Sequence, residues 1–422
     1  MNPALLDRLE TLRRRLADLD GPLPALAGPG AAPGAPSLGL VHPPTSLGPL
    51  DLLVTHCEVS ERHGTGVLLR RLFLGGAPVA TVRSVDLYGG EQDLGVVQVR
   101  LEHDRAPWAE VIAGVLRTLG HLEVRRILCV PYFPADVLTA LASREIFGAP
   151  MCTWVMDDQN IEARALPDDL LRRLFARSRL VLAISPELQR AYRGKFGRPV
   201  GLAPPAVSAR YVRREPGSPD AERLARRHGL IFGNIWGDRW LEGLLRTLDG
   251  AGVSLDWHSG GGTPWRSNDA QRLRRVGVVP RPRLEEPELV AALRASPFVV
   301  VPSGSLEGGD SHGFLARLSL PSRLPYVAAT AGTPVVVLGH PETAAARFVL
   351  RYGLGTVAPY ERSAFRAAVE ALCADEAQAQ CRAAAAKLAP LLSDDGLVDW
   401  IWRSLELGRP VDQRFQPLEH DV

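Results

Sequence analysis

The chain has 422 residues, 46% of them hydrophobic and 23% charged, which is typical of a globular protein long enough for two domains. Its 49 basic and 47 acidic side chains leave a formal charge of +2, which argues against nucleic acid as a partner. No apolar run of about 20 residues occurs, and the five cysteines are widely spaced without a C-x-x-C pair. We therefore expect no membrane-spanning helix, no disulfide framework and no zinc site. The expected location is the cytoplasm, with peripheral contact at the inner membrane face left open.

The N-terminal segment, residues 1–20, is expected to contain an amphipathic helix over residues 4–20. Its leucines follow 4-3-4-3 spacing, at Leu5, Leu9, Leu12, Leu16 and Leu19. This repeat favours either self-association through residues 4–20 or docking of the helix on the body of the protein. Residues 21–49 are rich in proline, glycine and alanine, which indicates a linker.

The folded body is expected to begin at residue 50, and residues 50–212 alternate between strand and helix patterns. The predicted strands are 51–56, 125–130, 151–156 and 180–184, and the predicted helices are 135–147 and 166–176. A glycine-bearing turn over 61–66 and an apolar stretch over 67–73 follow the first strand. Residues 213–221 contain two prolines and indicate an interdomain linker.

The same alternation returns in residues 222–394. The predicted strands are 230–233, 254–258 and 298–301, and the predicted helices are 239–249 and 286–295. Strands that are apolar throughout and alternate with helices favour a parallel sheet covered on both faces. The predicted fold class is α/β, with two Rossmann-like doubly wound parallel-sheet domains facing a cleft and an N-terminal helix extension. Residues 395–422 are expected to form a helix that crosses back over the interdomain joint, and a tail.

The most specific pattern lies in residues 319–338. Ser319 and Ser322 indicate a capped helix start, Gly332 breaks a short helix, and residues 335–338 form a buried strand. A helix start presents free backbone N–H groups to an anion, and Arg323 adds a cation that can grip two phosphate oxygens. We expect a phosphate-bearing ligand here.

Residues 178–206, 230–234, 297–303 and 319–355 together resemble the retaining glycosyltransferases of family 4, which have the GT-B fold. The resemblance covers roughly residues 50–407 as an ordered series of short motifs. It implies transfer of a sugar from a nucleotide-diphosphate donor, with retention of configuration, and it places the donor in the second domain. Asn234 and Arg239 follow the strand where the family carries diphosphate ligands.

Two family features are missing. The family usually has a ribose-binding glutamate where this chain reads Pro325-Tyr326-Val327, and the nearby candidates for that role are Glu307 and Asp310. The first-domain histidine is replaced by residues 131–134, which read Pro-Tyr-Phe-Pro.

The remaining candidates lie at predicted strand ends, where parallel sheets place ligands. Gly64 and Gly66 permit close backbone approach to a ligand, or form an ordinary turn. Asp157 and Asp158 would assist the acceptor or bind sugar hydroxyls, or else cap a helix. The other strand-end candidates for the donor site are His258, Gly260 and Ser303.

The predicted function is a glycosyltransferase of the hexosyltransferase type, without a metal or other cofactor. Asp157, Asp158 and Arg323 are its candidate catalytic residues. The predicted partners are a nucleotide sugar and a carbohydrate, lipid or small-molecule acceptor. Two alternatives remain: a catalytically silent GT-B partner or scaffold protein, and a sugar-nucleotide epimerase.

Overall fold

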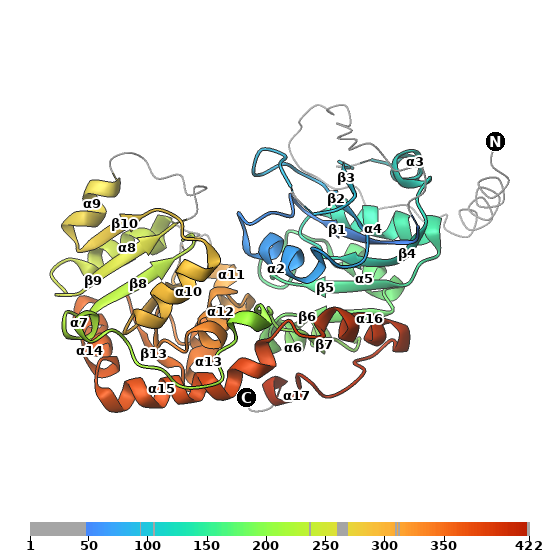
Figure 1. Ribbon diagram of the computed structural model, residues 1–422. Coiled ribbons are helices and arrows are strands. Elements are labelled where there is room, and N and C mark those ends of the chain that lie inside the picture. The colour runs from blue at the N-terminus through green and yellow to red at the C-terminus, as the bar shows by residue number, and fades with distance from the viewer. Residues whose placement is uncertain are drawn as a thin grey trace.

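The computed structural model describes residues 48–92, 94–103, 106–235, 238–259, 269–308, 310 and 313–419. They form two parallel sheets that lie side by side, each with helices packed on it (Figure 1). The expected helix over residues 4–20 and the linker that follows it lie outside the described residues. No helix in the described part of the chain is long and apolar enough to cross a membrane.

The first sheet has seven parallel strands in the order β3-β2-β1-β4-β5-β6-β7. Their bounds are β1 Leu50–Thr55, β2 Val79–Arg83, β3 Val97–Arg100, β4 Val124–Cys129, β5 Met151–Val155, β6 Leu180–Ala183 and β7 Gly201–Leu202. β1, β2 and β5 are buried along their whole length, which is why their sequences are continuously apolar or nearly so.

Five helices connect these strands. They are α2 Gly64–Phe73, α3 Trp108–Leu119, α4 Pro134–Phe147, α5 Asp168–Arg177 and α6 Pro186–Phe196. α6 shows how the sequence sets the ends of such a helix. The Ser185 hydroxyl accepts from the Leu188 N–H, Pro186 occupies the first turn, and Gly197 ends the helix with φ 62°.

The second sheet has six parallel strands in the order β10-β9-β8-β11-β12-β13. Its strands are β8 His228–Phe232, β9 Ser254–His258, β10 Val278–Arg281, β11 Val299–Pro302, β12 Val335–Leu338 and β13 Gly355–Ala358. The helices of this domain are α7 Ala221–Ala225, α8 Asp238–Leu248, α9 Asp269–Arg275, α10 Glu286–Ala295, α11 Gly313–Leu318, α12 Arg323–Thr330, α13 Ala344–Arg351, α14 Arg362–Leu372 and α15 Asp375–Leu388.

The fold class predicted from the sequence is confirmed, since both domains are doubly wound α/β units with parallel sheets. In each sheet the strand order reverses at one point, between β1 and β4 in the first domain and between β8 and β11 in the second. Ligands of open α/β sheets bind outside the carboxyl ends of the strands at such a reversal. These two positions are therefore where the functional site is expected.

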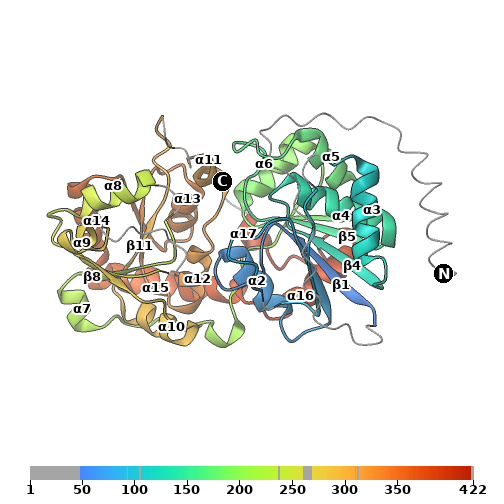
Figure 2. The ribbon, with the colours of Figure 1, turned by 90° about the horizontal axis from the view of Figure 1, so that it is seen from above.

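The chain returns to the first domain at its C-terminal end. α16 Leu397–Leu407 and α17 Gln416–Glu419 lie beside the first sheet rather than the second (Figure 2). The Trp402 ring lies 5.9 Å from the Phe73 ring of α2 and 4.4 Å from the Arg126 guanidinium. The segment from α15 to α16 therefore forms a second covalent connection between the two domains.

The two domains also share a core. One continuous cluster of buried apolar side chains extends from the first sheet through α12 to α16. Two ion pairs bridge the domains at its margin, Arg71 to Glu286 at 2.9 Å and Arg283 to Glu61 at 2.6 Å. The domains are therefore held at a defined distance, which fixes the space between their strand ends.

The element prediction differs from the structure in several places. No elements were predicted between residues 73 and 125, where β2, β3 and α3 lie, between 258 and 286, where α9 and β10 lie, or between 338 and 395, where α13, β13, α14 and α15 lie. The predicted turn over 61–66 contains the start of α2, because His63 caps that helix and Gly64 is its first residue. The helix predicted from residue 166 begins at Asp168, because Leu166 N–H is bonded to the Gln159 carbonyl.

Candidate active site

Two helix starts from different domains meet between the sheets. α2 begins at Gly64 after the carboxyl end of β1, and α12 begins at Arg323 in the second domain. A β-carbon built on Gly64 would lie 2.9 Å from the Ser322 hydroxyl oxygen, and both residues are exposed. Each helix start carries the positive end of a helix dipole. Their convergence makes a site suited to an anion.

Arg323 brings a formal positive charge to the same place. Its guanidinium donates to the Phe232 carbonyl at 3.0 Å, at the carboxyl end of β8, and its side chain packs on Gly233. Burial lowers the pKa of Arg323 to about 10, an effect opposed by the nearby Tyr360. Within the described residues no carboxylate pairs with this guanidinium. It therefore presents an unneutralised cation at the point where the second sheet reverses its strand order.

The expected capping at the start of α12 is wrong in one respect. Ser322 has helical backbone angles, and its side chain makes no capping hydrogen bond. The first turn of α12 thus keeps its backbone donors free of a side-chain cap. Ser319 does not belong to the helix start either, since its hydroxyl accepts the Asp158 N–H at 2.9 Å. Its role is a contact between the domains.

Asp157 lies at the end of β5 in a network of hydroxyl groups. The Tyr132 hydroxyl donates to the Asp157 carboxylate at 2.6 Å, and the Thr65 hydroxyl lies 2.8 Å from the Tyr132 oxygen. Burial raises the pKa of Asp157 from 3.8 to about 6, against the hydrogen bonds from Tyr132 and Ser319. A carboxyl that titrates near neutral pH can accept a proton from a substrate hydroxyl.

The neighbouring Asp158 is placed differently. It is fully buried, and its oxygens accept the N–H groups of Asn160, Ile161 and Glu162 and the Tyr192 hydroxyl. With both oxygens occupied, the carboxylate cannot reach a substrate. Asp158 therefore holds the loop after β5; it does not cap a helix, because α5 begins at Asp168 after Pro167.

The need for glycine at position 66 is explained by packing within the first domain, without a ligand. A β-carbon there would lie 2.3 Å from the Ser60 carbonyl oxygen and 2.7 Å from His63 Nε2. His63 Nδ1 accepts the Gly66 N–H at 3.3 Å, so the histidine caps α2. Gly64, in contrast, faces the space between the domains.

One cluster in the first domain has the atoms for a metal site that the sequence spacing does not indicate. The ligand atoms of His56, Cys57 and His63 lie within 4.8 Å of one another. Both nitrogens of His63 are already used, because Nδ1 accepts from Gly66 and Nε2 lies 2.7 Å from the Glu58 carbonyl oxygen. A metal would have to displace the second of these hydrogen bonds, so these residues do not fit an ion as they stand.

Of the candidates after β8 and β9, Asn234 directly follows Gly233, the residue on which the Arg323 side chain packs. Arg239 donates to the Gly308 carbonyl at 3.1 Å, and His258 Nδ1 lies 2.9 Å from the Pro282 carbonyl oxygen. Both side chains thus bind neighbouring loops of their own domain. Gly260 lies outside the described residues.

The candidates after β11 form a second group. Ser303 is buried, and its carbonyl accepts the Tyr360 hydroxyl at 2.7 Å. Asp310 accepts from the Trp240 indole at 2.9 Å and so anchors its loop, while the Glu307 side chain is exposed. Tyr360 also opposes the lowering of the Arg323 pKa that burial causes, so the loop after β11 that Tyr360 contacts lies near the Arg323 guanidinium.

The sequence reasoning did not single out Tyr132, Thr65 or Tyr360 as site residues. For Tyr132, its place directly after the strand predicted over residues 125–130 was a usable signal. Thr65 stands between the candidates Gly64 and Gly66, so its position was also a signal. Tyr360 follows β13, at the edge of the second sheet, where no strand was predicted.

Comparisons with known proteins agree with the fold. No family model and no curated protein matches the sequence. Among the solved structures that match over most of the chain are Anabaena Alr3699/HepE in complex with UDP and glucose, the lipopolysaccharide outer core galactosyltransferase WaaB, and a Listeria monocytogenes putative UDP-N-acetylglucosamine 2-epimerase.

For these three the sequence identities are 13, 12 and 13% and the TM-scores 0.59, 0.54 and 0.52. They cover 84, 84 and 87% of this chain and 99% of each matched chain. At such identities the likeness shows the fold, which is GT-B, and leaves the family open.

Proposed function

We propose that this protein is a glycosyltransferase that takes a sugar from a nucleotide-diphosphate donor and passes it to an acceptor hydroxyl. The observation that carries the proposal is the uncompensated Arg323 guanidinium beside two converging helix starts. A diphosphate supplies the negative charge that this arrangement lacks. The UDP in the HepE structure supports the same ligand class for a chain of this fold.

In the proposed reaction the bond from the sugar to the diphosphate breaks, and negative charge develops on the leaving phosphate. Arg323 and the first turn of α12 would stabilise that charge without reorganising, since both are held in place before the donor binds. The acceptor would enter from the first domain. Its hydroxyl oxygen would form the new bond to the sugar carbon, and its proton would pass to Asp157, which accepts a hydrogen bond from Tyr132.

The finer features rest on the resemblance to family 4. They are retention of configuration, a hexosyl donor, and reaction without a metal. The two adjacent aspartates lack the spacer of a metal-binding D-x-D motif, and Asp158 is occupied by the loop that it holds. Of the two acids considered for the ribose contact that the family makes through its glutamate, Asp310 is bonded to Trp240, which leaves Glu307 as the candidate.

The test is a screen of UDP-, GDP- and ADP-sugars for thermal stabilisation, followed by product analysis for the donor that binds. A ligand at a hundred times its Kd stabilises the native state by about 2.7 kcal/mol. Transfer to an added acceptor would support the proposal. Conversion of the donor to its epimer without an acceptor would favour the epimerase alternative, and absence of binding by every nucleotide sugar would refute both.

A further inference from the structure

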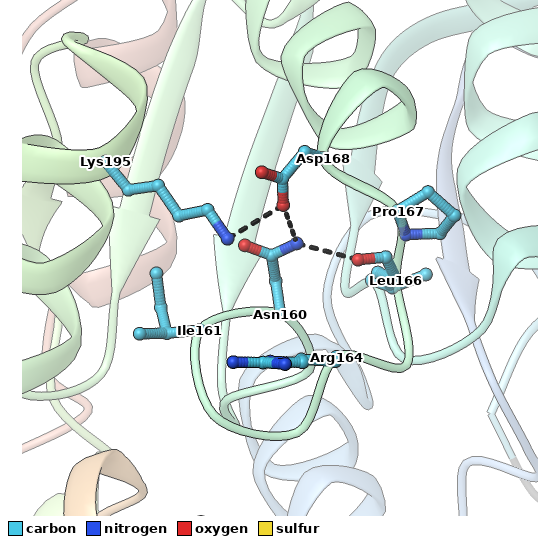
Figure 3. A pocket seen from close by; sticks show the side chains of 7 residues that line it. All are labelled: Asn160, Ile161, Arg164, Leu166, Pro167, Asp168 and Lys195. Atoms are coloured by element: carbon cyan, nitrogen blue, oxygen red, sulfur yellow. Dashed lines mark hydrogen bonds and ion pairs between the residues drawn. The ribbon is translucent and has the colours of Figure 1, made fainter.

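A separate cavity lies in the first domain between the loop after β5 and the last turn of α6. Its volume is about 380 Å³, within the usual range for small-ligand pockets. Seven residues line it: Asn160, Ile161, Arg164, Leu166, Pro167, Asp168 and Lys195 (Figure 3). None of them belongs to the donor site described above.

Asn160 gives the cavity an unused acceptor. The residue is 2% exposed, and its amide nitrogen donates to the Leu166 carbonyl at 2.7 Å and to Asp168 at 2.8 Å. Because both of these partners only accept, the orientation of the amide is fixed. Its oxygen is buried without a hydrogen-bond partner, a state that destabilises a protein by roughly 1–3 kcal/mol unless a ligand or water donates to it.

Hydrogen bonds fix the conformation of the loop that presents Asn160. Asp158 holds the N–H groups of Asn160, Ile161 and Glu162, and the Leu166 N–H bonds to the Gln159 carbonyl. The side chain of Asn160 is thus set between the Arg164 guanidinium and the Asp168 carboxylate (Figure 3). A preformed acceptor of this kind loses little freedom when a ligand binds.

Two cations share the cavity. Lys195 reaches in from α6 and donates to Asp168 at 2.7 Å, which leaves two of its three donor hydrogens for other partners. No described residue pairs with the exposed guanidinium of Arg164. With Asp168 the formal charge of the lining is +1, so the cavity suits a single anionic group.

We propose that this cavity binds a small anion that also carries hydroxyl groups, such as a sugar phosphate or a sugar carboxylate. A hydroxyl donates to Asn160 Oδ1, and the anionic group pairs with Arg164 and Lys195. The cavity lies beside the space between the domains, since Glu162 of the same loop is 3.9 Å from Arg317 of α11. The site goes beyond the proposed function, because it needs neither Arg323 nor a nucleotide.

The probes are glucose 6-phosphate and glucuronate, with glucose and inorganic phosphate as matched compounds that carry only one of the two features. Titration calorimetry on the full chain should show binding of at least one sugar anion, and tighter binding than either matched compound. UDP affinity, measured on the same samples, reports on the donor site separately.

The variants are Arg164→Gln and Lys195→Gln, and Arg193→Gln is the control, an exposed arginine on the same helix as Lys195. Each cavity variant should weaken binding of the sugar anion at least fivefold, while the control and the UDP affinity stay unchanged. Failure of both sugar anions to bind, or equal affinity in the Arg164→Gln variant, overturns the proposal. Arg164 is exposed, so that variant is expected to fold even if Lys195→Gln does not.

Discussion

The position of a β-carbon on Gly64 lies 2.9 Å from the Ser322 hydroxyl oxygen, although the two residues are 258 positions apart and belong to different domains. This approach brings the first turn of α2 against the first turn of α12. The space beside them is where the diphosphate of a donor is proposed to bind. A side chain at position 64 would occupy it.

We therefore expect Gly64→Val to weaken UDP binding at least tenfold. The hydroxyl of Ser322 can turn away from a single methyl group, but the branched side chain of valine would reach further across the gap. UDP affinity is measured by calorimetry. Gly194→Val is the control, because a β-carbon at Gly194 meets nothing within 4 Å. Equal UDP affinity in both variants would contradict the placement of the donor.

Gly66→Ala tests the structural role of the second glycine. Its β-carbon would lie 2.3 Å from the Ser60 carbonyl oxygen, which is backbone and cannot rotate away. We expect a loss of about 1–3 kcal/mol in the free energy of unfolding, measured by urea denaturation. Gly194→Ala should be neutral or slightly stabilising, since alanine favours a helix interior. A Gly66→Ala protein as stable as wild type would refute this account.

Asp157→Asn should change how stability depends on pH. The pKa of Asp157 is about 6 in the folded protein and near 3.8 when unperturbed, so the folded state binds the proton more tightly. Wild type therefore loses stability as the pH rises from about 4 to 6, and the full penalty remains above that range. Asparagine carries no charge and still accepts from Tyr132, so the variant should be more stable than wild type at pH 8.

The difference between the two proteins, measured by denaturation at pH 4 and pH 8, should be small at the lower pH and roughly 1–3 kcal/mol at the higher one. Asp169→Asn, which changes an exposed acid on α5, serves as the control. A variant less stable than wild type at pH 8 would show that the charged form of Asp157 is favoured by its surroundings.

Asp158→Ala should destabilise the protein strongly, because three backbone N–H groups and the Tyr192 hydroxyl would lose their acceptor. We expect a loss of roughly 3 kcal/mol or more in the free energy of unfolding. Glu162→Ala, at an exposed position of the same loop, should change it by no more than about 0.5 kcal/mol. Similar free energies of unfolding for the two variants would contradict the structural role assigned to Asp158.

The comparison of sequence and structure shows where sequence patterns carry information. β5 and β12 were predicted because they are apolar along their whole length, apart from Thr153 in β5, which reflects burial on both faces. β3 was missed because it has only four residues, of which only Val99 is buried, and such a short segment gives a weak pattern. The start of α12 was located correctly, but the backbone of Ser322 is helical and does not support the expected cap.

For the candidate site, too, the sequence predicted some residues and missed others. The chemistry of Arg323 follows from its residue type and its place at a helix start, so the sequence was enough to single it out. The contact between Tyr132 and Asp157 depends on β4 and β5 being neighbours in the sheet, which no local pattern encodes. Asp158 holds the loop and Asp157 faces the proposed acceptor side because the loop buries the Asp158 side chain, which the sequence alone does not reveal.

The most direct measurement of the central claim is the UDP affinity of the Arg323→Ala variant. Removal of an unpaired cation that grips a phosphate should weaken binding about thirtyfold, or roughly 2 kcal/mol, and Arg323→Lys should restore part of the loss. Arg246→Ala, at an exposed position of α8, should bind UDP like wild type. If the folded Arg323→Ala protein binds UDP within twofold of wild type, the proposed diphosphate site is wrong.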